Sequence, residues 1–409
     1  MSVPLTSIPP RMPRPRPPAI AESPRIARLR DGGPEAVARF WAEVTRTGAP
    51  LIERDGDATL ITFVWRERRP TRDVLALVNK LADRSDLSRS RMRKLPGSDL
   101  WHLTYRVRDD WQGSYHFAPD ESPHEPLELG PAHWRDVALN LVADPLNPVT
   151  LPQSRPPHKS VAAGPAATPA PRWWQPRPGT ARGTLDTVET AGRRVWRYLP
   201  PGHRSDGEAY PLLVLLDGDI WGPLLPVAPI LDNLIAAGRI PPLVALLPES
   251  GDRATRFTEY ACDPAFADFL ATGLIAKAGR DVNVTADPAR TVVAGQSLGG
   301  LTAAFAGLTR PERFGNVLSQ SGAFWWRSNT PDDVDAEWFA HQVALAGRRP
   351  VRWHVEVGLD EWVNLGPNRH LRDVLLARGY DLTYAEFAGG HDRLCWRERF
   401  GDALASLFT

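Results

Sequence analysis

The pattern of apolar and polar residues divides the chain into two halves. In the first half, short runs rich in β-branched and aromatic residues alternate with polar turns, at residues 58–65, 74–77, 100–107 and 113–117. Short alternating runs of this kind are typical of the strands of an antiparallel β-sandwich. Apolar residues at helical spacing over 33–47 predict one helix before them. We therefore expect a β-sandwich domain over residues 31–150.

In the second half the apolar runs are continuous and are separated by helical segments. Residues 211–216 and 243–247 are apolar throughout, as expected of strands that helices cover on both faces. Further strands are predicted at 194–199, 315–319, 351–357 and 382–387, and helices at 231–237, 266–278 and 368–378. Gly379 occupies the position after a helix where a left-handed residue ends it. Strands alternating with helices predict a mostly parallel α/β sheet over residues 186–409.

Two segments lack these patterns. Residues 1–30 are rich in Pro and Arg and are predicted to be disordered, because such a composition buries too little apolar surface to fold. They also lack the apolar run of a secretory signal, and no run in the chain is long enough to span a bilayer, so we expect a cytoplasmic protein. Residues 151–185, dense in Pro, Ala and Gly, are predicted to be a linker.

The composition narrows the classes of function. The 409 residues are 42% hydrophobic and 24% charged, with a formal net charge of +1. This balance is that of an ordinary globular protein and gives no reason to expect nucleic acid or membrane insertion. The two cysteines, Cys262 and Cys395, imply no disulfide framework, although their number is compatible with one bridge.

Ser297 is the best candidate for a reactive group. It lies in Gly295-Gln296-Ser297-Leu298-Gly299, between the apolar run 292–294 and the helical segment 301–308. A strand, a sharp turn and a helix in this order present a serine hydroxyl at the top of a parallel sheet. The glycines are needed because the backbone passes too closely there for side chains. The segment predicts the nucleophile of a serine hydrolase.

A serine nucleophile needs a base, and the base needs a carboxylate that orients it. In α/β-hydrolases the acid and the histidine each follow a later strand, in the chain order Ser, acid, His. His391 follows the last predicted strand, directly after two glycines, and is the predicted base. Asp360 and Glu361 both follow the strand 351–357; we favour Glu361, with Asp360 as the alternate acid.

The oxyanion that forms during acyl transfer needs backbone N–H donors. One is expected from Leu298, at the start of the helix after the nucleophile. The other is expected from Asp219, in the loop Asp217-Gly218-Asp219 after the strand 211–216. This chemistry requires no metal and no cofactor, and we expect none.

Several segments of the chain resemble the enterochelin (enterobactin) esterases. They read LLDGDIW (215–221), GQSLGGL (295–301), SQSGAFWW (319–326) and GGHDRLCWR (389–397), with TFVW (62–65), DLW (99–101) and DPLNP (144–148) in the first half. The resemblance covers roughly residues 35–409, and Gly-His-Asp-x-x-x-Trp-Arg is its most specific motif. It implies an immunoglobulin-like N-terminal domain followed by an esterase-D-type α/β-hydrolase domain.

The resemblance also implies roles for these residues. Ser297 is then the nucleophile and His391 the base, and Glu361 falls where the family has Gly-x-x-Glu, although some relatives work with a Ser–His dyad. The implied reaction is hydrolysis of the trilactone ester bonds of a ferric catecholate siderophore, which releases iron in the cytoplasm. The alternatives are a general carboxylester hydrolase or acyltransferase of the same fold, of the feruloyl-esterase kind, and a non-catalytic ferric-siderophore binding protein. The Ser, acid, His order argues against the last.

A ferric tris-catecholate is a trianion, so such a substrate calls for a cationic pocket with aromatic walls. Arginine can bond catecholate oxygens and stack on rings, and tryptophan supplies flat walls. The candidates beside the motifs are Arg256, Arg327, Arg393, Arg397, Trp221, Trp325, Trp326 and Trp396.

Overall fold

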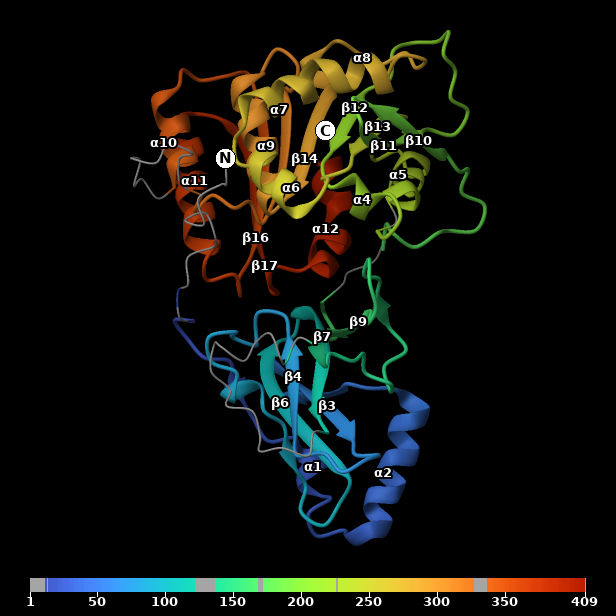
Figure 1. The fold of residues 1–409 in the computed structure, drawn as a ribbon, viewed down its shortest axis with the longest axis vertical. Coiled ribbons are helices and arrows are strands. Elements are labelled where there is room, and N and C mark those ends of the chain that lie inside the picture. The colour runs from blue at the N-terminus through green and yellow to red at the C-terminus, as the bar shows by residue number, and fades with distance from the viewer. Residues whose placement is uncertain are drawn as a thin grey trace. The chain divides into compact units, whose positions relative to one another are not determined.

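The structure, a computed structural model, separates into two compact units (Figure 1). It describes residues 12, 14–121, 137, 139–167, 172–225, 227–326 and 337–408. One unit, here called the β unit, contains the described residues up to 167 together with Ala388–Cys395. The other, the α/β unit, runs from residue 172 to Phe387 and resumes at Trp396. The predicted fold classes, a β-sheet domain followed by an α/β domain, are confirmed.

The β unit consists of two antiparallel sheets. One has the strand order β1-β6-β3-β2, with β5 on β6, and the other has the order β4-β7-β9-β8. The strands are β1 (Ala19–Ile20), β2 (Leu51–Asp55), β3 (Ala58–Arg66), β4 (Asp73–Val78), β5 (Arg93–Lys94), β6 (Leu100–Arg108), β7 (Gln112–Asp120), β8 (Thr150–Leu151) and β9 (Lys159–Ala163). The helices are α1 (Pro24–Ala27), α2 (Gly33–Thr47) and the 3-10 turn Ser88–Ser90.

The core of the β unit lies between its two sheets. Phe63 of β3 and Tyr105 of β6 come from one sheet, and Tyr115 and Phe117 of β7 come from the other. Phe63 meets Tyr105 and Tyr115 edge to face, with ring centroids 6.2 and 4.7 Å apart. Every second residue of a strand points to the same face, so the alternating runs of the sequence supply this core. The helix predicted over 33–47 is confirmed with the same bounds.

The N-terminal tail is more ordered than predicted. Ala19–Ile20 pairs with β6, and Ile26 of α1 is completely buried against α2. The prediction of disorder is therefore wrong for this stretch, because composition does not reveal a partner strand or helix that lies elsewhere in the chain. Residues 1–11 and 13 lie outside the described residues.

The predicted linker also contains regular structure. Lys159–Ala163 forms β9, which pairs antiparallel with β7, and β10 begins within the segment at Thr184. Ser160 and Ala162 are buried and alternate with half-buried neighbours. Five residues of this alternation, set among prolines and alanines, give too weak a signal to predict a strand. The strands predicted in the first half of the chain lie within β3, β4, β6 and β7.

The α/β unit is built on a sheet with the order β10-β11-β13-β12-β14-β15-β16-β17. β10, β11 and β13 pair antiparallel, and the pairs from β13 to β17 are parallel. The strands are β10 (Thr184–Thr190), β11 (Arg193–Leu199), β12 (Leu212–Leu215), β13 (Val244–Pro248), β14 (Thr291–Gln296), β15 (Asn316–Gln320), β16 (Arg352–Gly358) and β17 (Asp381–Phe387).

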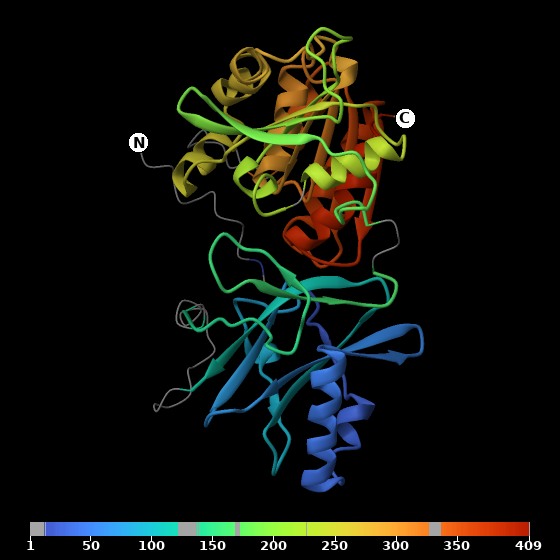
Figure 2. The same cartoon turned by 90° about the vertical axis from the view of Figure 1, so that its right-hand side faces the viewer.

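Helices lie on both faces of this sheet (Figure 2). They are α4 (Gly218–Trp221), α5 (Val227–Ala236), α6 (Arg253–Glu259), α7 (Pro264–Asp268), α8 (Leu274–Ala278), α9 (Leu298–Thr309), α10 (Trp338–Leu345), α11 (Leu365–Ala377) and α12 (Arg393–Ala405), with a π turn at Phe269–Gly273 and a 3-10 turn at Pro288–Arg290. Every residue of β12 and β14 is buried, which explains why these strands show no alternation. No helix in the described part of the chain has the length and apolar character needed to cross a membrane.

Candidate active site

Ser297 lies at the turn between β14, which ends at Gln296, and α9, which begins at Leu298. Its φ of 58° and ψ of −122° are unfavourable for a residue with a side chain. Backbone hydrogen bonds stabilise this conformation: Ser297 N donates to Gln320 O at 3.1 Å, and Ser297 O accepts from Ala323 N at 3.0 Å. The turn predicted from the sequence is therefore present, with the serine half-buried.

The glycines around Ser297 are required by close backbone contacts. A Cβ on Gly295 would lie 2.3 Å from the carbonyl oxygen of Gly299. A Cβ on Gly300 would lie 2.6 Å from Ser319 Oγ. These distances are far below van der Waals contact, so only glycine lets β14 and α9 approach each other at this turn.

The loop after β12 lies next to the nucleophile turn. A Cβ on Gly299 would lie 3.1 Å from Asp217 Oδ2, and Gly218 passes so close to Leu247 O that a Cβ there would be 2.1 Å away. Asp219 Oδ1 accepts from Ser250 N and Oγ at 2.9 and 3.0 Å. The N–H groups of Leu298 and Asp219 both belong to the first turn of a helix, where they have no intrahelical acceptor.

Arg256, predicted to contact substrate, is paired within the protein. Its Nε and one terminal nitrogen lie 2.7 and 2.9 Å from the two carboxylate oxygens of Asp217, and its guanidinium lies 4.9 Å from the centre of the Tyr260 ring. Burial lowers the pKa of Arg256, but the Asp217 charge outweighs burial and raises the pKa overall. Asp217 N donates to Tyr260 Oη at 3.2 Å. This arrangement makes Arg256 a support of the Asp217–Asp219 loop.

Glu361 lies in the turn after β16 and is completely buried. Its Oε1 accepts from Ser321 Oγ at 2.6 Å and from Gly358 N at 2.9 Å, and its Oε2 accepts from Asn364 Nδ2 at 2.7 Å. Trp396 Nε1 donates to the same Ser321 oxygen at 2.9 Å. Asp360, the alternate acid, is only half-buried. Ser321, Gly358 and Asn364 thus fix the orientation of Glu361 through hydrogen bonds from uncharged donors.

His391 follows β17 in the segment Ala388–Cys395, which belongs to the β unit. The ring is half-buried. Its carbonyl oxygen accepts from Asn79 Nδ2 at 2.9 Å, and the next residue, Asp392, is almost completely buried. Sequence reasoning identified His391 but not Asn79, because nothing in the local sequence connects two residues so far apart.

A chain of buried polar side chains begins at the residue before the nucleophile. Gln296 Oε1 accepts from Trp221 Nε1 at 2.8 Å, and Gln296 Nε2 donates to Gln320 Oε1 at 2.9 Å. Gln320 Nε2 donates to Glu356 Oε1 at 2.7 Å, and Arg399 Nε donates to Glu356 Oε2 at 2.8 Å. Burial raises the pKa of Glu356, but the charge of Arg399, the nearby His354 and the hydrogen bond from Gln320 outweigh it and lower the pKa to about 2. Trp221 and the two glutamines lie inside the quoted motifs, whereas Glu356 and Arg399 gave no signal in the sequence.

The tryptophans predicted as pocket walls are largely inside the protein. Trp221 and Trp326 are 1% and 2% exposed, and Trp325 and Trp396 are 9% and 8% exposed. The first two rings therefore offer no face to a ligand in this structure, and their prediction as walls is corrected to core residues.

The other predicted arginines differ in their surroundings. Arg397 is buried, 2.8 Å from a carboxylate oxygen of Glu398 and 3.9 Å from the centre of the Trp174 ring. Arg393 is half-buried, two residues after His391. Arg327 lies outside the described residues.

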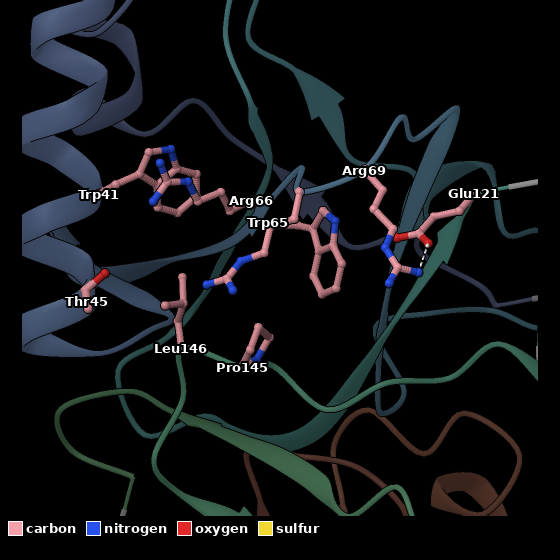
Figure 3. A pocket seen from close by; sticks show the side chains of 9 residues that line it. Trp41, Thr45, Trp65, Arg66, Arg69, Glu121, Pro145 and Leu146 are labelled. Atoms are coloured by element: carbon pink, nitrogen blue, oxygen red, sulfur yellow. Dashed lines mark ion pairs between the residues drawn. The ribbon is translucent and has the colours of Figure 1, made fainter.

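A cavity of about 230 Å³ lies in the β unit (Figure 3). Its lining residues are Trp41, Thr45, Trp65, Arg66, Arg68, Arg69, Glu121, Pro145 and Leu146. Two of its arginines are paired, Arg66 with Asp99 at 2.8 Å and Arg69 with Glu121 at 3.7 Å. The lining includes no Ser, Cys or His, so it contains neither a serine nucleophile nor a histidine base.

Metal and disulfide chemistry find no support in the described residues. Among them, no group of three or more His, Cys, Asp or Glu side chains is placed to hold a metal ion. Cys262 and Cys395 are both buried free thiols, so the bridge that their number allowed is not formed. Burial raises the pKa of the Cys262 thiol, which makes it a poor nucleophile.

Known protein families and relatives match both halves of the chain. A family model described as "Putative esterase" matches residues 191–407, and one described as "Enterochelin esterase, N-terminal" matches residues 60–174. The chain is 32% identical to the iron(III) enterobactin esterase of Dickeya dadantii, over 96% of this chain and 98% of that protein. It is 29% identical to the iron(III) salmochelin esterase of Escherichia coli O6:H1, over 90% and 93%.

A solved structure extends the likeness to the fold. The enterobactin esterase of Shigella flexneri, determined in the presence of enterobactin, matches with a TM-score of 0.75 at 30% identity. The match covers 88% of this chain and 95% of that chain. It therefore includes most of both units.

Proposed function

We propose, since this chain belongs to the enterochelin esterase family, that it is a serine esterase which opens the trilactone of ferric enterobactin-type catecholate siderophores and so releases their iron. The observation that carries this proposal is the backbone of Ser297, with its φ of 58° at the junction of β14 and α9. Such strain persists only where the surrounding structure enforces it, and here it occurs at the carboxyl end of a central parallel strand, as expected of a nucleophile turn.

The proposed reaction uses Ser297, His391 and Glu361. His391 takes the proton of the Ser297 hydroxyl as its Oγ attacks a lactone carbonyl, which forms a C–O bond and a tetrahedral oxyanion. The N–H groups of Leu298 and Asp219 donate to this oxyanion. When it collapses, the ring ester C–O bond breaks and His391 gives the proton to the leaving serine hydroxyl of the substrate. Water, activated by His391, then releases the acyl group from Ser297.

Burial and hydrogen bonding support Glu361 as the acid. A carboxylate that orients an imidazole must itself be fixed, and Glu361 accepts three hydrogen bonds while Asp360 is half-buried in the same turn. The pair Arg256–Asp217 supports the oxyanion loop in the same way. In the proposal both features serve to fix geometry before substrate binds.

The substrate class comes from the relatives. Relatives at similar identity act on iron(III) enterobactin or iron(III) salmochelin, so both trilactones are candidate substrates. We place the reaction in the cytoplasm, where release of iron from an imported siderophore is useful to a cell. A general carboxylester hydrolase of the same fold remains the alternative that a substrate panel separates.

Mass spectrometry of the products tests this function. The protein is incubated with ferric and iron-free enterobactin, with a glucosylated trilactone and with a simple aryl ester, and Ser297→Ala is the control. The proposal expects linear trimer, dimer and monomer of dihydroxybenzoylserine to accumulate with wild type only. Hydrolysis of the aryl ester without attack on any trilactone would favour the general esterase. Tight binding of the ferric siderophore without hydrolysis of any ester would favour a binding protein.

A further inference from the structure

The segment that carries His391 is hydrogen-bonded to the β unit on both sides of the histidine. On the N-terminal side, Gln112 N donates to Ala388 O at 3.3 Å, and Gln112 forms a parallel bridge with Gly389. At the histidine itself, Asn79 Nδ2 donates to the His391 carbonyl at 2.9 Å. On the C-terminal side, Ser114 N and Oγ donate to Asp392 Oδ2 at 2.7 and 2.6 Å. Contacts at Ala388, Gly389, His391 and Asp392 thus connect this segment to β7 and to the turn after β4.

Gly390 allows this close approach. A Cβ at Gly390 would lie 2.6 Å from Asn79 Oδ1 and 2.4 Å from Lys80 Cγ. Lys80 has a φ of 58°, which is uncommon for a residue with a side chain. The turn after β4 therefore packs so closely against the segment that carries His391 that position 390 has room only for glycine.

Ser114 forms hydrogen bonds with both Asn79 and Asp392. Its carbonyl oxygen accepts from Asn79 N at 2.9 Å, while its own N–H and hydroxyl donate to Asp392. Ser114 and Asp392 are 1% and 2% exposed. The second oxygen of Asp392 accepts from Leu394 N at 3.1 Å and so caps the start of α12. A buried carboxylate is stable only when donors surround it, which makes the Ser114–Asp392 pair a strong constraint on position.

We propose that Ser114, Asn79 and Asp392 are positioning residues for the catalytic base. This inference rests on the proposed function, because it takes His391 as the base. The hydrogen bonds fix the carbonyl of His391 and the side chain of the next residue, and together they fix the point from which the imidazole projects. A general base works only within hydrogen-bond reach of its proton, and a displacement of 1 Å can cost about 100-fold in rate.

Matched serine variants of the full-length chain test the proposal. Ser114→Ala removes one of the two donors to Asp392 Oδ2, while Ser160→Ala removes an equally buried hydroxyl from the neighbouring strand β9, where it accepts from Asp144 N at 2.9 Å. We expect Ser114→Ala to lower kcat on a p-nitrophenyl ester about 10-fold, the cost of one charge-assisted hydrogen bond, with KM unchanged. Ser160→Ala should retain the kcat of wild type even if both variants melt at the same lowered temperature.

Substitutions of Asp392 extend the series. Asp392→Ala removes the acceptor of both Ser114 donors and should lower kcat about 100-fold. Asp392→Asn keeps one acceptor oxygen and should recover most of that loss. In a His391→Ala background Ser114→Ala should cause no further loss, because residues that act through one group are not additive.

Hydrogen exchange separates this proposal from the proposed function. Amides of residues 388–395 should exchange faster in Ser114→Ala than in Ser160→Ala, whatever the protein catalyses. Equal exchange and equal kcat in the two variants would overturn the positioning role. Full activity of His391→Ala would instead overturn the assignment of the base, and with it the proposed mechanism, while the exchange result would still report whether Ser114 fixes the segment.

Discussion

The proposed nucleophile and the proposed base are fixed by two different kinds of interaction. Ser297 depends on its neighbours in the chain: β14 before it and α9 after it are buried, and hydrogen bonds of its own backbone stabilise the turn. His391 depends on polar side chains from distant positions, since Asn79 is 312 residues away and Ser114 is 278 residues from Asp392. The sequence signal for Ser297 lies in the residues next to it, whereas the contacts that fix the His391 segment arise only in the tertiary fold.

This difference has a consequence for how each residue tolerates change. Backbone hydrogen bonds stabilise the conformation of Ser297, so we expect the turn to persist when the hydroxyl is removed. The position of the His391 segment uses side chains of the β unit, so substitutions far from His391 in the sequence can alter its geometry. The following predictions test this contrast, from the largest expected effect on activity to the smallest.

Ser297→Ala should abolish ester hydrolysis and leave the fold intact. Loss of the nucleophile of a catalytic triad costs about 10⁶ in kcat, and His391→Ala should cost nearly as much because the two act as a unit. The backbone hydrogen bonds of the turn remain in Ser297→Ala, so its thermal unfolding should match that of wild type. Turnover near the wild-type rate by folded Ser297→Ala would contradict the assignment of the nucleophile.

The same contrast explains how much of the site could be predicted from the sequence. The turn at Ser297 and the strands from β11 to β17 were predictable, because continuous apolar strands and glycines at close contacts are local features. The bond between Ser114 and Asp392 was not, because either residue alone is an ordinary polar residue. Strand β9 and the ordered part of the tail were missed for the same reason, since each is stabilised by a partner distant in the chain.

The prediction that Arg256 contacts substrate rested on its residue type and its place beside a motif. An arginine beside a motif suggests an anionic ligand, but here the anion is Asp217 of the protein itself. Trp221 was wrongly predicted to be a pocket wall, because a tryptophan near a motif can equally belong to the core. Its indole N–H donates to Gln296. Sequence shows which side chains are present, whereas their partners depend on the fold.

Glu361→Gln should lower kcat by about 100-fold or more, because the acid orients the imidazole and stabilises its positive charge. Asp360→Asn, in the same turn, is the matched control and should have a milder effect. Steady-state kinetics on an aryl ester measures both. If Asp360→Asn proves the more damaging, the acid is the neighbouring residue; if neither matters, the enzyme works as a Ser–His dyad.

Arg256→Ala should lower kcat about 10-fold on ferric trilactone and on a neutral aryl ester alike. The substitution leaves the buried Asp217 carboxylate without its cation, and the loop that donates the Asp219 N–H then loses its support. Arg197→Ala is a control for the loss of an ion pair away from this loop, since it breaks a more exposed pair with Asp186 between β10 and β11 at one edge of the sheet. A loss confined to the ferric substrate would restore Arg256 to the substrate-binding role that its sequence position suggested.

Glu356→Gln should change activity least and the pH dependence of stability most. The pKa of Glu356 is lowered from 4.5 to about 2 in the folded protein, so its ionised form stabilises the fold at every pH above 4.5. That contribution is lost as the pH falls from 4.5 towards 2, and it amounts to something on the order of 3 kcal/mol.

The variant should therefore unfold more easily than wild type at pH 7, and the gap should narrow as the pH falls below 4.5. Denaturant unfolding at pH 7, 5, 4 and 3 measures the free energy of both proteins across this window. Glu356 lies in the polar chain that ends at Gln296, next to the nucleophile, yet the turn of Ser297 does not depend on that chain for its backbone bonds. A kcat reduced 100-fold in Glu356→Gln would show that the nucleophile, too, depends on distant polar side chains and would remove the contrast between the two sites.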